Sequence, residues 1–232
     1  MKDVIVALDF QSKEEVVEFL KGFPEPIYTK VGMELFNREG PDIVRYLKAK
    51  GHKVFLDLKF HDIPNTVAGA VRSVASLDVD MLNVQAAGGI AMMEAGLAEL
   101  KKQGKGTILL SITMLTSTNS EILKNELWID HPLDDTVLHY AANTKKAGLP
   151  GVVCSALEVP LIKSHLGADF VTVTPGIRPA GDAKGDQARV VTPDQARSLG
   201  SDYIVVGRPI TKNSDPYGAY RKIRAEFLGL ED

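Results

Sequence analysis

Four charged residues follow or end three short apolar runs near the start of the chain: Asp9, Lys30, Asp57 and Lys59. Alternating acids and amines in a partly dry pocket are costly unless each charge is paired. Such groupings are also where catalytic chemistry is usually placed. A lysine there supplies a compact cation that can both attract negative charge and donate a proton. The alternative interpretation is a structural ion-pair network that fastens the strands together.

Strand periodicity predicts where these charges point. In the third run Asp57 and Lys59 share a face with Phe55, because strand side chains alternate with period two. The opposite face is apolar throughout, as expected under a layer of helices, and carries Val54, Leu56 and Leu58. Neighbouring strands lie about 4.8 Å apart, so charges at their ends are expected to converge.

Eight β-branched runs alternate with longer amphipathic segments from end to end of the chain. The expected strands are Val4–Leu8, Ile27–Val31, Lys53–Leu58, Met81–Val84, Thr107–Ile112, Gly151–Cys154, Phe170–Val173 and Tyr203–Val206. About eight helices are expected between them, and no Ser/Pro-rich linker divides the chain. This α/β pattern predicts a single (β/α)8 TIM barrel over residues 1–232, with a doubly wound open sheet as the runner-up. A barrel places its active site in the loops at the carboxyl ends of its strands.

Several helix starts are marked by capping signals. Capping boxes are expected at Ser12-x-x-Glu15, Ser155-x-x-Glu158 and Thr192-Pro193-x-Gln195. Asp215-Pro216 is typical of an N-cap followed by proline at the first helical position.

Composition excludes some classes of partner. The chain has 232 residues, a net charge of −3 and a pI near 6.0. Nucleic acid or an anionic membrane would favour a basic face, so neither is expected as a partner. A small anionic substrate needs only a few local cations and remains compatible.

Cysteine content and the N-terminal run favour a cytoplasmic protein. Cys154 is the one cysteine, so no intramolecular disulfide can form. The apolar run that begins at Val4 is cut by Asp9 and is too short for a signal peptide. No stretch approaches eighteen apolar residues, so no membrane span is expected.

The segment from Asp57 to Val67 carries a resemblance to a known family. It reads Asp-Leu-Lys-Phe-His-Asp-Ile-Pro-Asn-Thr-Val. The Asp-x-Lys-x-x-Asp part also occurs in related barrels that act on sugar phosphates. With Phe-His before the second aspartate and Ile-Pro-Asn-Thr after it, the segment resembles the signature of the orotidine 5′-monophosphate decarboxylase family.

Further landmarks of that family recur in order along essentially the whole chain. The similar segments are Val6–Asp9, Lys30–Gly32, Thr113–Ser117, Thr174–Arg189 and Val206–Ile210. The resemblance implies decarboxylation of orotidine 5′-monophosphate to uridine 5′-monophosphate and CO₂, the last step of de novo UMP biosynthesis, without metal or organic cofactor.

The resemblance also implies roles for the charged residues. Lys59 is expected to protonate pyrimidine C6 as CO₂ leaves, and Asp57 to lie beside the substrate carboxylate. Lys30 and Asp9 are expected to bind the ribose hydroxyls and orient the network. Asp62 is expected to complete the row from the partner subunit of a homodimer; its alternative role is to cap the helix before which it stands.

The remaining substrate contacts follow from the same resemblance. Thr66 is expected to reach the ribose across the dimer interface, and Thr116 to hydrogen-bond the pyrimidine. Thr113 and Ser117 stay open as alternatives for the pyrimidine contact.

A phosphate site is expected after the seventh and eighth strands, where barrels commonly bind phosphate. Gly207 would let backbone N–H groups approach the anion, and Arg208 would bind it bidentately. Arg178 and Gln187 lie in the loop over residues 176–189, whose three glycines suggest a lid that closes over the ligand.

No metal site is expected, because the five histidines show no metal-ligand spacing and Cys154 has no partner thiol. Two other functions stay open. One is a Mg²⁺-dependent sugar-phosphate decarboxylase or aldolase of the same superfamily. The other is a barrel that binds nucleotides without catalysis.

Overall fold

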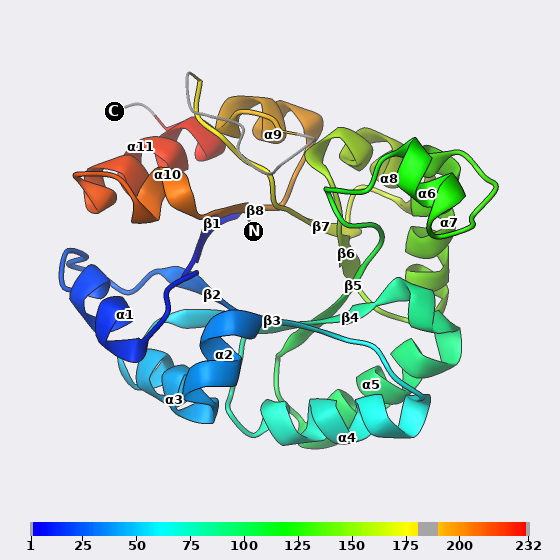
Figure 1. Cartoon of the computed structure of the whole chain (residues 1–232), viewed down its shortest axis with the longest axis horizontal. Helices are drawn as coiled ribbons and strands as arrows, with labels where there is room; N and C mark the ends of the chain where they lie inside the picture. The colour runs from blue at the N-terminus through cyan, green and yellow to red at the C-terminus, as the bar shows by residue number, and fades with distance from the viewer. Residues whose placement is uncertain (1, 181–189, 231–232) are drawn as a thin grey trace.

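Eight parallel strands form a closed barrel in a computed structural model that describes residues 2–180 and 190–230. Each strand pairs with the next in sequence, and the eighth pairs with the first, from Asp3 opposite Tyr203 to Val6 opposite Val206. Viewed along the barrel, the strands make an inner ring and the helices surround it (Figure 1). The predicted (β/α)8 barrel is confirmed, and the alternative of an open doubly wound sheet is wrong.

The strands lie within a residue or two of their predicted positions. They are β1 (Asp3–Ala7), β2 (Tyr28–Gly32), β3 (Lys53–Phe60), β4 (Met81–Gln85), β5 (Ile108–Ile112), β6 (Gly151–Val153), β7 (Val171–Thr174) and β8 (Tyr203–Val206). The largest difference is in β3, which continues to Phe60, two residues beyond the apolar pattern that predicted it.

Helices are more numerous than the eight expected. The described residues form α1 (Lys13–Leu20), α2 (Met33–Glu39), α3 (Pro41–Ala49), α4 (Pro64–Ala75), α5 (Gly89–Gln103), α6 (Ser120–Asn125), α7 (Leu133–Lys146), α8 (Val159–Leu166), α9 (Pro193–Leu199), α10 (Arg208–Thr211) and α11 (Pro216–Leu228). Two short 3₁₀ helices, η1 (Ala86–Gly88) and η2 (Ala156–Glu158), precede α5 and α8. Gly40, at φ 64°, separates α2 from α3, since this left-handed conformation favours glycine and interrupts a helix.

Most predicted caps are present. Thr192 and Gln195 form a complete capping box on α9, and Ser155 and Glu158 form one on η2. The Asp215 carboxylate accepts a hydrogen bond from the Gly218 N–H at the start of α11. The box at Ser12 forms only in part: its hydroxyl accepts from the Glu15 N–H, but the Glu15 carboxylate accepts from the Gln11 N–H instead.

Apolar side chains fill both the inside and the outside of the barrel wall. The interior cluster alternates along the strands with the helix-facing cluster, as period two requires. Its buried members are Ile5, Ala7, Tyr28, Phe55, Met81, Leu110, Val173 and Val205. The outer face packs against the helices, where Val54 and Leu56 are fully buried. The packed interior leaves the carboxyl ends of the strands as the place for a site.

The outer layer contains no membrane-spanning candidate. Among the described residues, every helix is too short or too polar to cross a bilayer.

Candidate active site

The four charges singled out in the sequence meet at the carboxyl ends of β1, β2 and β3. Lys30 Nζ lies 3.0 Å from Asp9 Oδ1 and 3.7 Å from Asp57 Oδ2. Lys59 Nζ lies 2.7 Å from Asp57 Oδ1. The result is a continuous row of alternating charge from Asp9 through Lys30 and Asp57 to Lys59.

Strand register explains why the row forms. Ala7 of β1 lies opposite Lys30, and Lys30 lies opposite Phe55 of β3. Ala7 and Phe55 belong to the interior cluster, so Lys30 points inward with them. Asp57 follows Phe55 by two residues and keeps the inward direction.

Asp57 is the most enclosed carboxylate of the row, with 13% of its side chain exposed. Burial raises the pKa of the Asp57 carboxyl, but Lys30, Lys59 and the hydrogen bonds from Lys59 and Asn83 outweigh it. The net effect places this pKa below its usual range. Asp57 is therefore ionised at neutral pH, between two lysine ammonium groups.

The sequence pattern did not reveal Asn83 of β4. Its side chain is buried and contacts both members of the Asp57–Lys59 pair: Nδ2 lies 2.6 Å from Asp57 Oδ1, and Oδ1 lies 2.8 Å from the Lys59 amide nitrogen. Asn83 shares its face of β4 with Met81 of the interior cluster. A polar residue at such an inward position was the available signal, since buried polar groups take hydrogen-bond partners.

A cavity of about 300 Å³ opens beside Asp57 and Lys59. Its wall is mostly apolar and comes from the ends of β5 and β6 and the loop after β5. The other lining residues are Ile112, Met114, Leu115, Thr116, Ser117, Val153, Cys154 and Pro175. A mostly apolar cavity with a few polar groups at one side is typical of a small-molecule site. A planar ring could rest on the apolar wall with one edge toward Lys59.

The three candidates for a ring contact differ in placement. Thr116 and Ser117 line the cavity. Thr113 is buried, and its hydroxyl donates to the Val153 carbonyl oxygen at 3.3 Å. Because the Thr113 hydroxyl already donates its proton to β6, Thr116 and Ser117 are the better candidates for a ligand contact.

Asp62 and Thr66 lie apart from the row, on the exposed surface where β3 leads into α4. The Asp62 carboxylate accepts from the Ile63 N–H at 2.6 Å. The N-cap of α4 is Ile63, with no side-chain hydrogen bond to the helix, so Asp62 does not cap it. Within the described residues no ion pair is formed by Asp62. Both side chains are accessible to a second protein surface.

Three of the four expected phosphate residues are described, and they follow β7 or β8 in the chain. Gly207 adjoins Asp9, because a Cβ built on it would lie 3.6 Å from Asp9 Oδ2. Arg208 is exposed at the first position of α10. The Arg178 guanidinium donates to the Ile177 carbonyl oxygen at 2.8 Å. Gln187 lies outside the described residues, as does most of the expected lid over 176–189.

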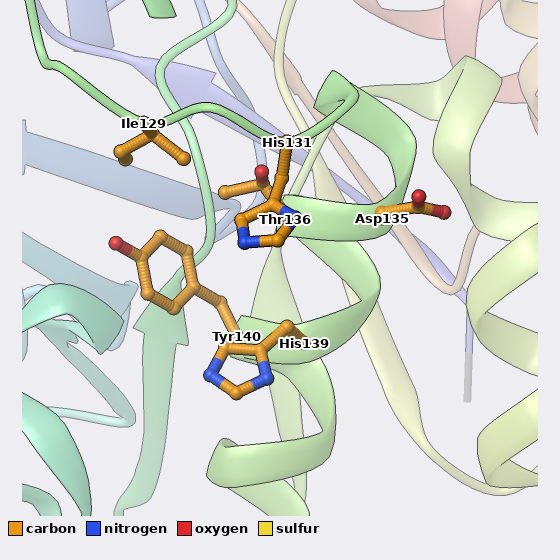
Figure 2. Close-up of a pocket in the computed structure, with 6 residues that line it drawn as sticks. All are labelled: Ile129, His131, Asp135, Thr136, His139 and Tyr140. Atoms are coloured by element: carbon orange, nitrogen blue, oxygen red, sulfur yellow. The ribbon is translucent and has the colours of Figure 1, made fainter.

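A second cavity, also about 300 Å³, lies at the start of α7 and contains none of the predicted site residues. Its lining is Ile129, His131, Asp135, Thr136, His139 and Tyr140. Figure 2 shows Asp135 pointing away from the two imidazole rings. Over residues 2–180 and 190–230 no group of three or more His, Cys, Asp or Glu side chains is arranged to hold a metal ion.

Taken together, the molecule is a (β/α)8 barrel with a Lys–Asp charge row beside a ring-sized cavity at the carboxyl ends of its strands. The model of the orotidine 5′-phosphate decarboxylase / HUMPS family matches residues 2–223. The chain belongs to this family.

Individual relatives agree with the family match. The chain is 56% identical to an orotidine 5′-phosphate decarboxylase of Bacillus cytotoxicus, over 99% of this chain and 98% of that protein. A solved orotidine 5′-phosphate decarboxylase from Lactobacillus acidophilus is 42% identical with a TM-score of 0.87, covering 98% of this chain and 99% of that one. A solved uncharacterized conserved protein from Geobacillus kaustophilus is 48% identical with a TM-score of 0.85, covering 97% of this chain and 99% of that one.

Proposed function

We propose that this chain, as one decarboxylase barrel domain over residues 1–232, converts orotidine 5′-monophosphate to uridine 5′-monophosphate and CO₂. This is a carboxy-lyase reaction and the last step of de novo UMP biosynthesis. Its support is the full-length similarity to orotidine 5′-phosphate decarboxylases, together with one observation of geometry. The Lys59 ammonium is fixed 2.7 Å from the partly buried Asp57 carboxylate at the edge of the cavity.

Lys59 is the proposed general acid. The bond between C6 and the carboxylate breaks with its electron pair left on C6, in the plane of the ring, where no adjacent π-system can delocalise it. A preorganised cation stabilises this developing negative charge. Lys59 then transfers a proton to C6 and is reprotonated from solvent.

Asp57 is proposed to hold Lys59 in place and to lie beside the substrate carboxylate. Two carboxylates in contact repel each other, and the repulsion ends when neutral CO₂ departs. The positioning role depends only on the observed contact between Lys59 and Asp57.

Lys30 and Asp9 are proposed to bind the ribose hydroxyls, and Thr116 the pyrimidine. The mutual contact of Lys30 and Asp9 at the barrel mouth supports the first role. The place of Thr116 in the cavity wall supports the second.

Gly207, Arg208, Arg178 and Gln187 are proposed to bind the phosphate. Binding energy from this remote group can be used to position the reacting carbon. Orotidine, which lacks the phosphate, should therefore have a kcat lower by about tenfold or more, not only a higher KM. Steady-state kinetics on nucleotide and nucleoside would test this; equal kcat values with a raised KM would contradict it.

A homodimer is proposed to complete the site. Its support is the family resemblance, together with the exposure of Asp62 and Thr66 where β3 leads into α4. Asp62 and Thr66 would then reach the partner's site. Mixing and reassociating Lys59→Ala and Asp62→Ala chains would test this. Random heterodimers with one intact site each would restore about a quarter of wild-type activity, whereas sites built within one chain would restore none.

The experiment for the reaction follows loss of the orotate chromophore in the ultraviolet, with EDTA present. Wild-type protein should convert the substrate completely. Lys59→Ala should lower kcat by roughly 10⁴-fold or more, because it removes both the proton donor and the charge stabilisation. Lys53→Ala is the matched control: this lysine stands at the other end of β3, over the Tyr28 ring, and its loss should leave kcat unchanged.

The remaining outcomes identify the alternatives. Nucleotide binding without conversion would indicate a binding protein that lacks catalysis. If the protein neither converted nor bound the nucleotide, the sugar-phosphate enzymes of the superfamily would become the preferred class, and Mg²⁺ would be added to the assay.

A further inference from the structure

The backbone of β3 is irregular at the point where it presents the catalytic pair. Leu56 pairs with Leu82 of β4, but the next matched pair is Phe60 with Val84. Three residues of β3, from Asp57 to Lys59, therefore stand opposite one residue of β4, which is Asn83. This is a bulge with two extra residues, and bulges of this kind redirect side chains at the rims of barrels.

Lys59 adopts a left-handed conformation within this bulge, with φ at 54°. For a residue with a Cβ this conformation costs roughly 1–2 kcal/mol, so it persists only where neighbouring contacts hold it. The bulge also removes the regular ladder partner of the Lys59 N–H. A buried or half-buried N–H needs another acceptor.

The Asn83 side chain replaces the missing backbone partner of the Lys59 N–H. Its Oδ1 accepts from the Lys59 N–H at 2.8 Å, and its Nδ2 donates to Asp57 Oδ1 at 2.6 Å. Asp57 Oδ1 in turn accepts from Lys59 Nζ at 2.7 Å. One amide group thus closes a ring of contacts that includes the Lys59 backbone, the Lys59 ammonium and the Asp57 carboxylate. Asn83 is 1% exposed, so water does not compete for these hydrogen bonds.

We infer that Asn83 is a positioning residue for the decarboxylation: it holds the backbone of Lys59 in its left-handed conformation and orients the Asp57 carboxylate toward the Lys59 ammonium. The inference rests on the proposed roles of Lys59 and Asp57. Asn83 acts through these two residues, and the amide is suited to this because it offers one donor and one acceptor at fixed angles.

Two substitutions separate the contacts. Asn83→Leu has nearly the same shape and removes both hydrogen bonds. We expect its kcat to fall about 100-fold, as for a displacement of a reacting group by about 1 Å. KM should change less than about threefold, because the contacts to ribose and phosphate remain. Hydrogen exchange at the Lys59 amide should become faster in this variant.

Asn83→Asp keeps the acceptor for the Lys59 N–H and replaces the donor by an oxygen beside the Asp57 carboxylate. Two carboxylates at this short distance repel each other when both are ionised, so the pair tends to hold one proton and the pKa of one carboxyl is raised. When protonated, Asp at position 83 can again donate to Asp57. The ratio of the kcat of Asn83→Asp to that of wild type should therefore rise as the pH falls. The other charged groups near the carboxyl groups at positions 57 and 83 are Lys30, Lys59 and Asp9.

Thr144→Val is the matched control. Thr144 of α7 is fully buried, and its hydroxyl contacts Ser111 of β5. Like Asn83→Leu, it removes a buried hydrogen bond next to a barrel strand, but one outside the site. It should lower the unfolding temperature and leave kcat, KM and the exchange of the Lys59 amide as in wild type.

The outcomes distinguish this inference from the proposed function. A wild-type protein that does not decarboxylate the nucleotide refutes the function itself. Active wild type, with Asn83→Leu folded and within threefold of its kcat, refutes only the role of Asn83. If Asn83→Leu does not fold, the Asn83→Asp variant decides: a kcat ratio to wild type that stays constant with pH overturns the inference.

Discussion

Lysine–aspartate pairs lie at both ends of the barrel, and their carboxylates are held differently. At the amino end, Asp80 Oδ2 accepts from Lys48 Nζ at 2.6 Å and from the Val54 N–H at 2.7 Å. Asp202 is bound in the same manner, by Lys163 Nζ at 2.7 Å and by the N–H and hydroxyl of Thr172. Both carboxylates therefore fasten the beginning of a neighbouring strand.

At the carboxyl end, Asp57 is contacted by side chains alone. Lys30, Lys59 and Asn83 are its partners, and within the described residues no backbone N–H donates to it. The Asp57 carboxylate therefore orients the ammonium groups of Lys30 and Lys59, whereas Asp80 and Asp202 hold the backbone of a neighbouring strand. A cavity adjoins this pair. A cavity alone does not distinguish the two ends, because Asp80 also lines one, of about 280 Å³. The comparison teaches that a Lys–Asp pair beside a cavity indicates chemistry when its carboxylate binds side chains alone, and indicates structure when it binds the backbone of a neighbouring strand.

Among the substitutions that test this comparison, the largest effect is expected at the carboxyl end. Asp57→Asn keeps the shape of the side chain and removes the charge between Lys30 and Lys59. We expect kcat to fall by roughly 10³-fold, since both the orientation and the charge balance of Lys59 are lost. Steady-state decarboxylation kinetics would measure this. A kcat within threefold of wild type would mean that Asp57 is as structural as Asp80.

The matching substitution at the amino end, Asp80→Asn, should do the reverse. It weakens hydrogen bonds to Lys48 and to the backbone of β3, so the unfolding free energy should fall by about 2 kcal/mol. The kcat should stay within about twofold of wild type, because no residue of the site is contacted. Urea unfolding and kinetics on one preparation would check both values. A large loss of kcat with unchanged stability would remove the distinction between the two ends.

The smallest effect concerns pH. His52 precedes β3 at the amino end, is 7% exposed, and its Nδ1 accepts from the Ile27 N–H at 3.0 Å. Burial lowers the pKa of His52, so the unfolded chain takes up a proton that the folded chain resists. The contribution of neutral His52 to the unfolding free energy is therefore fully present above the unfolded pKa of about 6.5. It is lost as the pH falls from this value toward the lower pKa of the folded state.

His52→Asn keeps an acceptor for the Ile27 N–H and cannot titrate. It should flatten the decline of unfolding free energy between about pH 6.5 and 5 by roughly 1 kcal/mol or less, with no change in the pH profile of kcat. His165→Asn, on the exposed side of α8, removes a histidine without touching this contact and is the control. An altered kcat profile in His52→Asn would show that the two ends are coupled.

Periodicity in the sequence was enough to predict the barrel and the convergence of Asp9, Lys30 and Asp57. Regular strands place alternate residues on one face, and the first three strands are regular as far as Asp57. The same rule could not predict the bulge, because period two assumes equal numbers of residues on paired strands. Lys59 thus reaches the site by a backbone path that the pattern did not contain.

Asn83 was missed for a related reason. Its partners are the backbone of Lys59 and the side chain of Asp57, and a contact across strands depends on register. One of the extra helices was missed because α2 and α3 form one amphipathic stretch that only Gly40 divides. The roles proposed for Asp62 and Thr66 would depend on a second chain, and no pattern within one chain specifies the surface of another.

The pairing of β1 with β8 has a consequence for the synthesis and folding of the protein. The first strand to leave the ribosome has an open edge until the last strand arrives, and nearly the whole chain separates the two. Open strand edges invite association with other chains, and distant contacts slow folding. All four charges of the row are synthesised within the first 59 residues, yet their scaffold closes only when Tyr203–Val206 are in place. A nascent or truncated chain without β8 would therefore be an aggregation risk and not a partly working barrel.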